Sequence, residues 1–530
     1  MSEEEKKEIE QQKQQTENEK KEVQKILEKD KQEIQQQEIK KPKQTEYQQE
    51  IKQKFWNFVL ISMCFAFFYV IGTYKIRTGI GVFIASLGQI GCCFAVLKQW
   101  KVEMKKDTVY YVVMIIIMNV LMLWTDQSFL HFWHKKMILL LFFMMMLHQF
   151  YEDKLWSLKT YIYNLFLLLF GSIASLFEPI ENFIEQMKKK EQKNQKWSYV
   201  ILGLGIALPL TFFIVAMLMS ADGVFANMII KLVGNLFLPQ NVIAVTFLFM
   251  LGYWLFYCFV SGLARKEASQ KTKESKQAEP IIAITFTSVL LVVYVLFCSI
   301  QIWYLFIGKG KLPEEFTYAS YARRGFFELL FVSLINFLMV IICNWKFRKN
   351  KILNSILIVI SICNFVMMAS SFYRMMLYVK AYHMTVMRMY VLWFLVMLAV
   401  SMAGVVYSIF HKEKKLYQYL FVVVFVFLTA LSAVRPQAYV VRYNLEHMKQ
   451  YTRTDINHFI YACSLDIVPE IAKIDVNKIV TKEGEQSGEE MLKKYFESVL
   501  RECDERTART YHIGVAQAEK AAREYLEKHK

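Results

Sequence analysis

The stretch VVMIIIM at residues 112–118 is apolar at every position, and it decides the class of fold. Strands of a membrane-spanning barrel alternate apolar and polar side chains, so an unbroken apolar run argues against that architecture. A helix that crosses the hydrocarbon core needs about 20 mostly apolar residues, because each residue rises about 1.5 Å. The run lies within such a stretch, at Val109 to Trp124, and similar stretches follow one another from residue 55 to residue 434.

The sequence therefore predicts an all-α, polytopic membrane protein with about 11–12 spans. A hydrophobic content of 55% in 530 residues, with 27 Met and 42 Phe, exceeds what a soluble core of this size requires. The expected spans are Phe55 to Thr73, Gly79 to Leu97, Val109 to Trp124, Met137 to Phe150, Tyr161 to Phe177, Trp197 to Ser220, Asn241 to Leu263, Pro280 to Phe306, Arg324 to Cys343, Ile352 to Phe372, Met389 to Phe410 and Gln418 to Val434.

Two polar regions flank this transmembrane helical domain of residues 55–434. Residues 1–54 form a Glu-, Lys- and Gln-rich tail with 13 Lys, 13 Glu and one Asp, so its charge is nearly balanced. Residues 435–530 are predicted to form a small extramembrane helical domain, because apolar side chains such as Leu492, Phe496 and Val499 recur at steps of three and four residues.

The net charge of +17 comes from basic clusters beside the spans, and it predicts an orientation. Lys and Arg next to spans are retained on the cytoplasmic side, which places the tail inside and residues 435–530 outside. This requires an odd number of crossings, whereas twelve is even. Either Met137 to Phe150 or Tyr161 to Phe177, which Gly171 interrupts, is expected not to cross. The clusters are Lys98 with Lys101, Lys105 and Lys106; Lys188 to Lys190; Arg265 with Lys266; Lys346 with Arg348, Lys349 and Lys351; and Lys412 with Lys414 and Lys415.

Seven of the nine cysteines lie in the expected spans or at their edges, and the other two are Cys463 and Cys503. Both fall in the region expected outside, where an oxidising environment supports a disulfide between them. The alternative is that each is a small buried hydrophobic side chain.

Charges near membrane depth mark candidate functional positions, because a central charge costs about 2.5–3.5 kcal/mol on insertion. Arg324 and Glu328 lie four residues apart and share one helical face, Arg388 opens a later span, and Asp222 ends a long apolar run. In one interpretation they converge on a polar cavity that binds a charged substrate or relays protons. In the other, the arginines anchor the helices at the interface and Asp222 caps a short helix.

A weak local repetition adds two tyrosines to the candidate cavity. Tyr318 precedes Arg324 by six positions, and Tyr382 precedes Arg388 by the same distance. With one span between them, the two copies face the same side, as in a parallel repeat.

Several strings resemble the bacterial membrane family catalogued as DUF 4173, whose function is unknown. They are Ser-Ala-Asp-Gly-Val-Phe at 220–225, Tyr-Ala-Arg-Arg-Gly-Phe-Phe-Glu-Leu-Leu at 321–330, Tyr-His-Met-Thr-Val-Met-Arg-Met-Tyr at 382–390, and Arg435, Ala438, Tyr439, Arg442, Tyr443 and Asn444 followed by Asp455 and Asp466 to Pro469. The resemblance covers roughly residues 200–475 and implies a bacterial cytoplasmic membrane. That family usually has Pro after the aspartate, where this chain has Gly223.

Recognisable enzyme and metal signatures are not found in this sequence. There is no H-E-x-x-H, no phosphate-binding G-x-x-x-x-G-K and no G-x-S-x-G, so an enzyme is not the favoured class, and no catalytic residue or cofactor is expected. His131 and His134 share a face that could hold a metal with Asp126, but the adjacent Phe132 and Trp133 favour an interfacial anchor.

Three functional classes remain open. The first is a structural or regulatory membrane protein whose outer helical domain meets an envelope protein partner. The second is a transporter or channel that uses Arg324, Glu328, Arg388 and Asp222, and the third is an intramembrane transferase. The lipid bilayer is the expected surrounding, no nucleic acid is expected as a partner, and the sequence names no small-molecule ligand.

Overall fold

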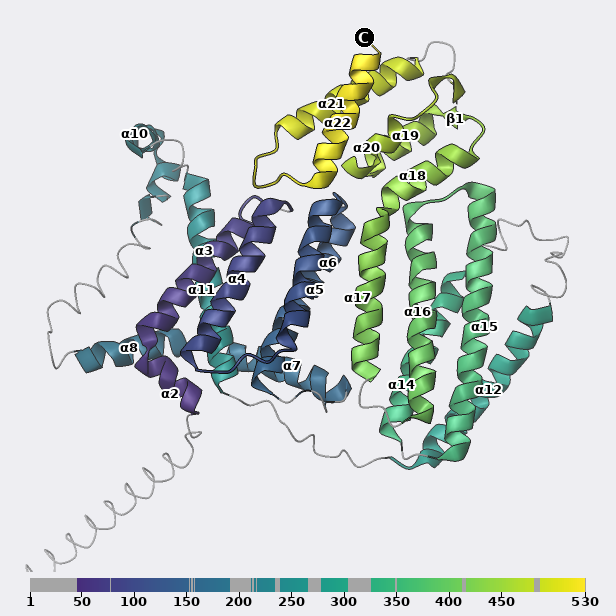
Figure 1. Ribbon diagram of the computed structural model, residues 1–530, viewed down its shortest axis with the longest axis horizontal. Coiled ribbons are helices and arrows are strands. Elements are labelled where there is room, and N and C mark those ends of the chain that lie inside the picture. The colour runs from purple at the N-terminus through teal and green to yellow at the C-terminus, as the bar shows by residue number, and fades with distance from the viewer. Residues whose placement is uncertain are drawn as a thin grey trace, which may run out of the picture.

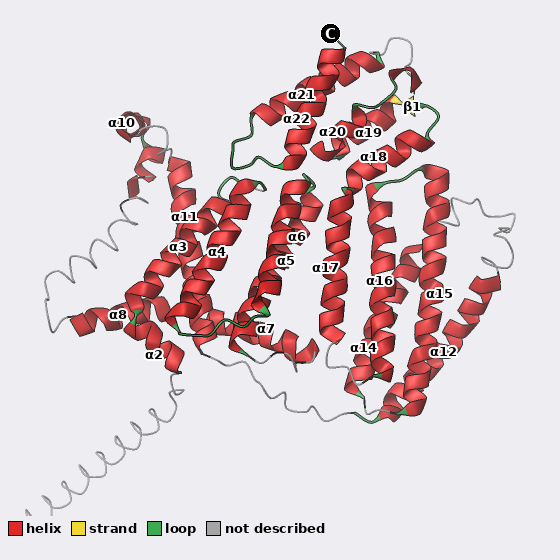
Figure 2. Ribbon diagram, viewed as in Figure 1, coloured by secondary structure: helices red, strands yellow, loops and turns green. Residues whose placement is uncertain are grey.

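The computed structural model describes residues 45–190, 211–233, 239–265, 278–303, 326–347, 350–411, 416–480 and 487–529, apart from residues 77, 152, 154–155, 157, 212–213 and 216. In this part the chain is almost entirely helical, with one pair of short parallel strands, β1 (Tyr451–Thr452) and β2 (Ile479–Val480) (Figure 2). Nine of the described helices are long and apolar enough to cross a bilayer. The predicted all-α polytopic architecture is confirmed.

These nine helices are α3 (Phe55–Thr73), α4 (Ile80–Gln99), α6 (Ser128–Phe150), α11 (Pro239–Ala264), α12 (Pro280–Gln301), α14 (Phe326–Lys346), α15 (Lys351–Tyr382), α16 (Val386–Phe410) and α17 (Leu416–Val434). A shorter apolar helix of 17 residues, α5 (Thr108–Trp124), packs beside α6. Residues 1–44 of the charged tail and most of the expected span Trp197 to Ser220 lie outside the described residues.

One end of the helix bundle, which we call the basic face, carries the lysine-rich loops. Tyr47 of α2 (Glu46–Gln53), Trp100 after α4 and Phe150 at the end of α6 meet there, with ring centroids 5.3–5.6 Å apart. Nζ of Lys105 donates to the carbonyl of His148 at 2.8 Å and so ties the α4–α5 loop to the end of α6. The opposite end, the domain face, carries the C-terminal helices (Figure 1).

Helix α7 (Leu158–Ala174) does not cross the bundle. Near its start, the ring of Tyr161 stacks on Tyr417 at the beginning of α17, with centroids 4.9 Å apart. At its end, the carbonyl of Ala174 accepts from Nη2 of Arg265, just beyond α11, at 3.0 Å. Tyr417 and Arg265 both lie at the basic face, so both ends of α7 stay on one side, and α8 (Glu178–Lys190) continues along that side (Figure 1).

This course of α7 removes it from the helices that join the two faces. Helix α2 lies at the basic face and α18 (Pro436–His447) at the domain face, and in the described part of the chain α5 joins the two faces together with the nine longer apolar helices. The segment predicted from Met137 is a complete helix, because α6 begins nine residues earlier, at Ser128, and has 23 residues. The polar side chains in its first turns make this part of α6 look like a loop in the sequence.

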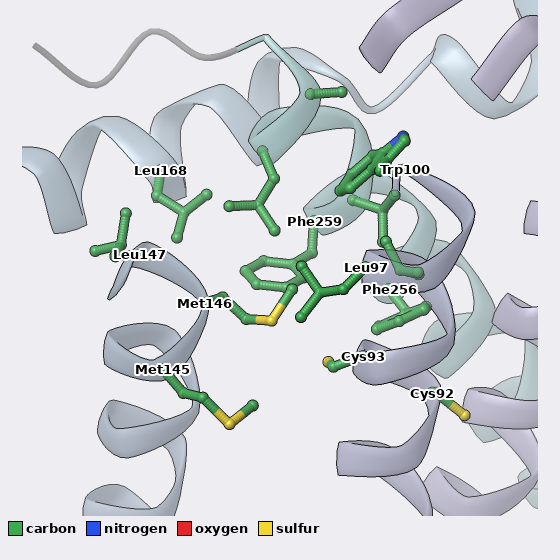
Figure 3. Packing of buried hydrophobic residues seen from close by; sticks show 14 of the residues in the cluster. Cys92, Cys93, Leu97, Trp100, Met145, Met146, Leu147, Leu168, Phe256 and Phe259 are labelled. Carbon is green, nitrogen blue, oxygen red and sulfur yellow. The ribbon is translucent and has the colours of Figure 1, made fainter. Parts of the chain in front are cut away.

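The membrane part contains two groups of helices. In the first, α3, α4, α6, α7 and α11 share one buried apolar cluster, where Leu97, Met146 and Phe259 lie close together (Figure 3). In the second, α12 and α14 to α17 share another cluster. The groups meet where Phe425 of α17 packs with Ile115 of α5 and neighbouring residues.

The C-terminal helices form a domain with its own apolar core. The core gathers Val441, Ile456, Phe496 and Tyr525, and the last two rings lie 4.2 Å apart. The helical periodicity expected after Val434 is thus buried against neighbouring helices. The elements after α18 are α19 (Arg453–Ala462), the short 3₁₀ turn η4 (Leu465–Ile467), α20 (Val468–Ile471), the 3₁₀ turn η5 (Val476–Lys478), α21 (Gly488–Asp504) and α22 (Ile513–Lys528).

Candidate functional site

The structure does not bring Asp222 and Arg388 together. Asp222 caps α10 (Gly223–Val233), with its Oδ1 accepting from the backbone N–H of Val224 at 2.8 Å. Arg388 lies at the start of α16, and α10 and α16 stand far apart along the long axis of the molecule (Figure 1). Tyr318 and Arg324 lie outside the described residues.

Arg388 closes the end of α15. Its guanidinium donates to the carbonyls of Tyr382, at 2.9 Å, and His383, and it lies 4.1 Å from the ring centroid of Tyr378. These contacts satisfy free carbonyls at a helix C-terminus. Tyr382 and Glu328 are exposed, so neither side chain lines an enclosed polar site.

Cys463 and Cys503 are free thiols, so the predicted disulfide is not formed. Both pack in the apolar core of the domain, and burial raises the pKa of each thiol to about 11. Because the thiolate is the reactive form, Cys503 acts as a small buried hydrophobic side chain and the half-buried Cys463 packs in the same way. This is the alternative that the sequence left open.

His131 and His134 point into the protein and do not serve as an interfacial anchor. Nε2 of His131 lies 2.7 Å from the carbonyl of Thr125, and Nε2 of His134 lies 2.7 Å from Oγ of Ser432 in α17. Across the described residues, no three His, Cys, Asp or Glu side chains are placed to hold a metal ion. The two histidines instead fix α6 against its neighbours.

In the described part of the chain, a cluster of buried and half-buried charged side chains lies where the C-terminal domain meets the bundle. Asp126, between α5 and α6, places Oδ1 at 2.9 Å from Nε2 of His512 and at 3.3 Å from Nη1 of Arg506. Asp466 of η4 accepts from the backbone N–H of Asp126, at 3.0 Å, and from the hydroxyl of Thr125. The α5–α6 loop is therefore held by two separate parts of the domain.

Arg435 adds a third attachment at the point where α17 passes into the domain. Its φ of 53° turns the chain sharply into α18. Its guanidinium lies 4.0 Å from the ring centroid of Trp124, donates to the Trp124 carbonyl at 2.6 Å and also bonds Gln517 of α22. We call Asp126, Arg435, Asp466, Arg506 and His512 the ionic junction.

The ionic junction tolerates burial because its charges balance. It contains two carboxylates and two guanidinium groups, and buried charges persist when they are paired and hydrogen-bonded. Burial acts to raise the pKa of Asp126, but the hydrogen bond from His512 and the charge of Arg506 outweigh it and lower this pKa. For Asp466 burial wins over its hydrogen bonds, so its pKa is raised.

The loop between α21 and α22 also covers the start of α4. The backbone N–H groups of Ile80 and Gly81 donate to the carbonyls of Tyr511, at 3.2 Å, and Arg509, at 3.0 Å. These are the N–H groups that a helix leaves without an internal partner. Gly79 has a φ of 124°, and a Cβ there would lie 2.5 Å from the Arg509 carbonyl, so the approach requires glycine.

An open pocket of about 880 Å³ lies beside the ionic junction. Its walls come from the α3–α4 loop, the start of α6, and the domain, so it exists only while the domain is docked. Such a volume suits a small organic ligand. The lining residues are Lys75, Thr78, Asp126, Ser128, Phe129, His131, Gln437, Tyr461, Cys463, Ser464, Glu502, Glu505, Arg506, Thr507, Arg509 and Thr510.

Sequence reasoning did not find this junction. Asp126 was noted only as a metal candidate, and Asp466 and Arg435 only within a family pattern. Arg506 and His512 lie 380 and 386 residues from Asp126, in a segment whose interleaved charges are typical of a solvated helix. No short-range pattern carries a contact over that distance.

Comparison with known proteins identifies the family. The model of a family described as "Domain of unknown function (DUF4153)" matches residues 112–474, more than half of the chain. The chain belongs to this family. The resemblance correctly indicated a family of unknown function, but the family is DUF4153 and not DUF 4173. The match also begins earlier than the resemblance did, inside α5. No curated protein and no solved structure matches the chain.

The family match includes three of the five residues of the ionic junction. Asp126, Arg435 and Asp466 lie within it, whereas Arg506 and His512 lie beyond its end at residue 474. The family match and the described spans make the chain a multi-pass membrane protein of a family without an assigned function.

Proposed function

We propose that the protein is a membrane-embedded regulatory protein whose helical domain meets a protein partner and passes the effect of that contact to the helix bundle. The observation that carries this proposal is the ionic junction. A domain that serves only as a tethered binding module needs no buried ion pairs to its anchor. Here the domain contacts the α5–α6 loop and the start of α4, and Arg435, which follows α17, bonds both Trp124 of α5 and Gln517 of α22.

We further propose that the domain lies outside a bacterial cytoplasmic membrane. The support is the distribution of basic residues. Lys98, Lys101, Lys105, Lys346 and Lys351 all lie at the end of the bundle opposite the domain. Positive residues beside spans are retained in the cytoplasm, so the basic face is inside and the domain is outside. The partner is then a protein of the cell envelope.

The transporter alternative has less support. Its predicted cavity requires Asp222 and Arg388 to converge, and they stand far apart (Figure 1). The Arg388 guanidinium donates its hydrogen bonds to backbone carbonyls, and Asp222 caps a short helix. The buried charges that the structure groups together lie between the bundle and the domain, where they are suited to coupling the two.

The test is site-specific photo-crosslinking in native membranes. A photoreactive residue replaces Tyr461, which is 84% exposed on the domain, or Ile282, which is 61% exposed on the lipid-facing side of α12 as a control. We expect a discrete protein adduct from position 461 and none from position 282. In an Asp126→Asn background the adduct from position 461 should fall.

Two outcomes would overturn the proposal. Equal yields from positions 461 and 282 would show that the domain meets no specific partner. An adduct that Asp126→Asn leaves unchanged, although the domain is loosened, would show that partner contact and junction are not coupled.

A further inference from the structure

We propose that the pocket beside the ionic junction binds the headgroup of a phospholipid that carries a primary ammonium, with its phosphate on Arg509 and Lys75 and its ammonium on Glu505. This inference goes beyond the proposed function, since it concerns a small ligand and requires no protein partner. Three features of the pocket carry it: the charges left after internal pairing, the level of the pocket, and its continuity with a lipid-facing surface.

The first feature is the balance of charge in the lining. Arg506 pairs with both Asp126, at 3.3 Å, and Glu502, at 2.9 Å, so these three side chains keep one net negative charge. In the described part of the chain, Glu505 and Arg509 take part in no ion pair, and both are exposed to the pocket. Internal pairing therefore leaves one carboxylate and one guanidinium for a ligand.

Lys75 adds a second cation with only a neutral partner. Its Nζ lies 2.7 Å from Oδ1 of Asn241, and the same side chain lines the pocket. Two cations and one carboxylate match a phosphate linked to an ammonium. A simple anion would also meet Glu505, and like charges repel. The hydroxyl of Ser128 adds a neutral donor suited to a phosphate oxygen.

The second feature is the level of the pocket in the membrane. Its walls include the start of α6 and the loop before α4, where two spanning helices end. Lipid headgroups lie at this level, just outside the hydrocarbon core. A headgroup therefore enters without leaving its leaflet.

The third feature is an aromatic surface that runs from the pocket to the lipid. Phe129 lines the pocket and stacks on Tyr390 with ring centroids 4.5 Å apart. Phe132 and Trp133 follow on α6 and are 53% and 47% exposed. Aromatic side chains concentrate at the membrane interface, and here they give the acyl chains of a bound lipid an apolar path away from the polar pocket.

The experiment measures hydrogen exchange of residues 505–512 in the full chain. The protein is reconstituted in nanodiscs of phosphatidylcholine alone, of phosphatidylcholine with phosphatidylethanolamine, or of phosphatidylcholine with phosphatidylglycerol. The ammonium of phosphatidylethanolamine donates hydrogen bonds to a carboxylate, the trimethylammonium of phosphatidylcholine cannot, and phosphatidylglycerol has no cation. We expect slowed exchange with phosphatidylethanolamine only.

Matched variants assign the effect to the pocket. Arg509→Gln and Glu505→Gln each remove one charge from exposed side chains, and each should require about tenfold more phosphatidylethanolamine for the same protection. Arg501→Gln and Glu497→Gln remove the same charges from exposed positions of α21 outside the pocket, and they should behave as wild type.

The remaining outcomes decide against the proposal or one part of it. Equal protection by all three lipid mixtures, or protection that survives in Arg509→Gln and Glu505→Gln, would overturn it. If phosphatidylglycerol protects residues 505–512 as well as phosphatidylethanolamine does, the proposed contact between the lipid ammonium and Glu505 is wrong. In a last experiment, soluble glycerophosphoethanolamine is added to phosphatidylcholine nanodiscs. Protection equal to that by phosphatidylethanolamine would show that the ligand is a soluble molecule and would overturn the proposal of a bound lipid. All of these measurements use purified protein, so they are independent of the partner.

Discussion

Asp126→Asn tests the ionic junction directly. The asparagine keeps the shape and one carbonyl oxygen of Asp126 but removes its charge. The Asp126 and Arg506 side chains are only 14% and 19% exposed. Breaking a buried pair costs about 3–5 kcal/mol when the other charge is left alone. Arg506 retains Glu502, so we expect the cost of one hydrogen bond to a charged group, about 2 kcal/mol.

This cost should appear as opening of the domain away from the bundle. The backbone amides of Ile80 and Gly81 report it, because they donate across the boundary to Tyr511 and Arg509. A loss of about 2 kcal/mol corresponds to roughly 30-fold faster hydrogen exchange at these two amides. Amides in the core of α21 should change little, because the domain itself stays folded.

The control is Asp504→Asn. Asp504 lies on the same domain, its carboxylate is 71% exposed, and it is 4.0 Å from Arg523. Exposed pairs of this kind contribute little, so exchange at Ile80 and Gly81 should remain as in wild type. Unchanged exchange in Asp126→Asn, or acceleration that spreads equally through α21, would refute the coupling role of Asp126.

The same contact has a defined pH dependence. Because the pKa of Asp126 is lowered in the docked domain, its contribution is present above about pH 4, the ordinary range of aspartate, and is lost as the pH falls through the lowered value. Asp466 has a raised pKa, so its contribution weakens docking as the pH rises through that value. Spin labels on domain and bundle should show that Asp126→Asn, but not Asp466→Asn, removes the loss of docking in acid.

Two further predictions concern the membrane helices. A Cβ on Gly404 of α16 would lie 2.0 Å from the ring of Tyr419 in α17, so Gly404→Ala should destabilise the protein by about 1–3 kcal/mol. In the control Gly91→Ala the new Cβ meets no atom within 4 Å, so this variant should be slightly more stable than wild type. Thermal unfolding in detergent compares the two variants. On a cysteine-free background, Glu181→Cys should be protected from an impermeant thiol reagent added outside cells, whereas Glu497→Cys should react; labelling of both would contradict the placement of α7 and α8 at the basic face.

Much of the fold follows from local pattern. Long apolar runs specify α-helices in a bilayer, since each backbone N–H must be satisfied within its own segment. The periodicity of α21 likewise predicts an amphipathic helix. The exceptions are α6 and α7. The polar His131 and His134 make the start of α6 look like a loop in the sequence. Helix α7 is apolar but has only 17 residues, and the contacts of Tyr161 and Arg265 keep both of its ends at the basic face.

The candidate site depended on contacts that no local pattern encodes. Arg388 and Asp222 stand out in the sequence because a charge beside a span is conspicuous, yet each satisfies nearby backbone groups. The predicted disulfide assumed that two cysteines in one compartment meet, whereas both thiols are free: Cys503 is buried in the apolar core and the half-buried Cys463 packs against it.

The sequence alone determined that this chain has helices suited to span a membrane and that a helical domain follows the last of them. These properties depend on composition and on spacing within single helices. The tertiary structure decided which residues of the bundle the charged side chains of that domain pair with. Asp126 is paired with Arg506 and His512 only because the domain folds back over the α5–α6 loop, and a pairing across 380 residues depends on the packing of the whole chain.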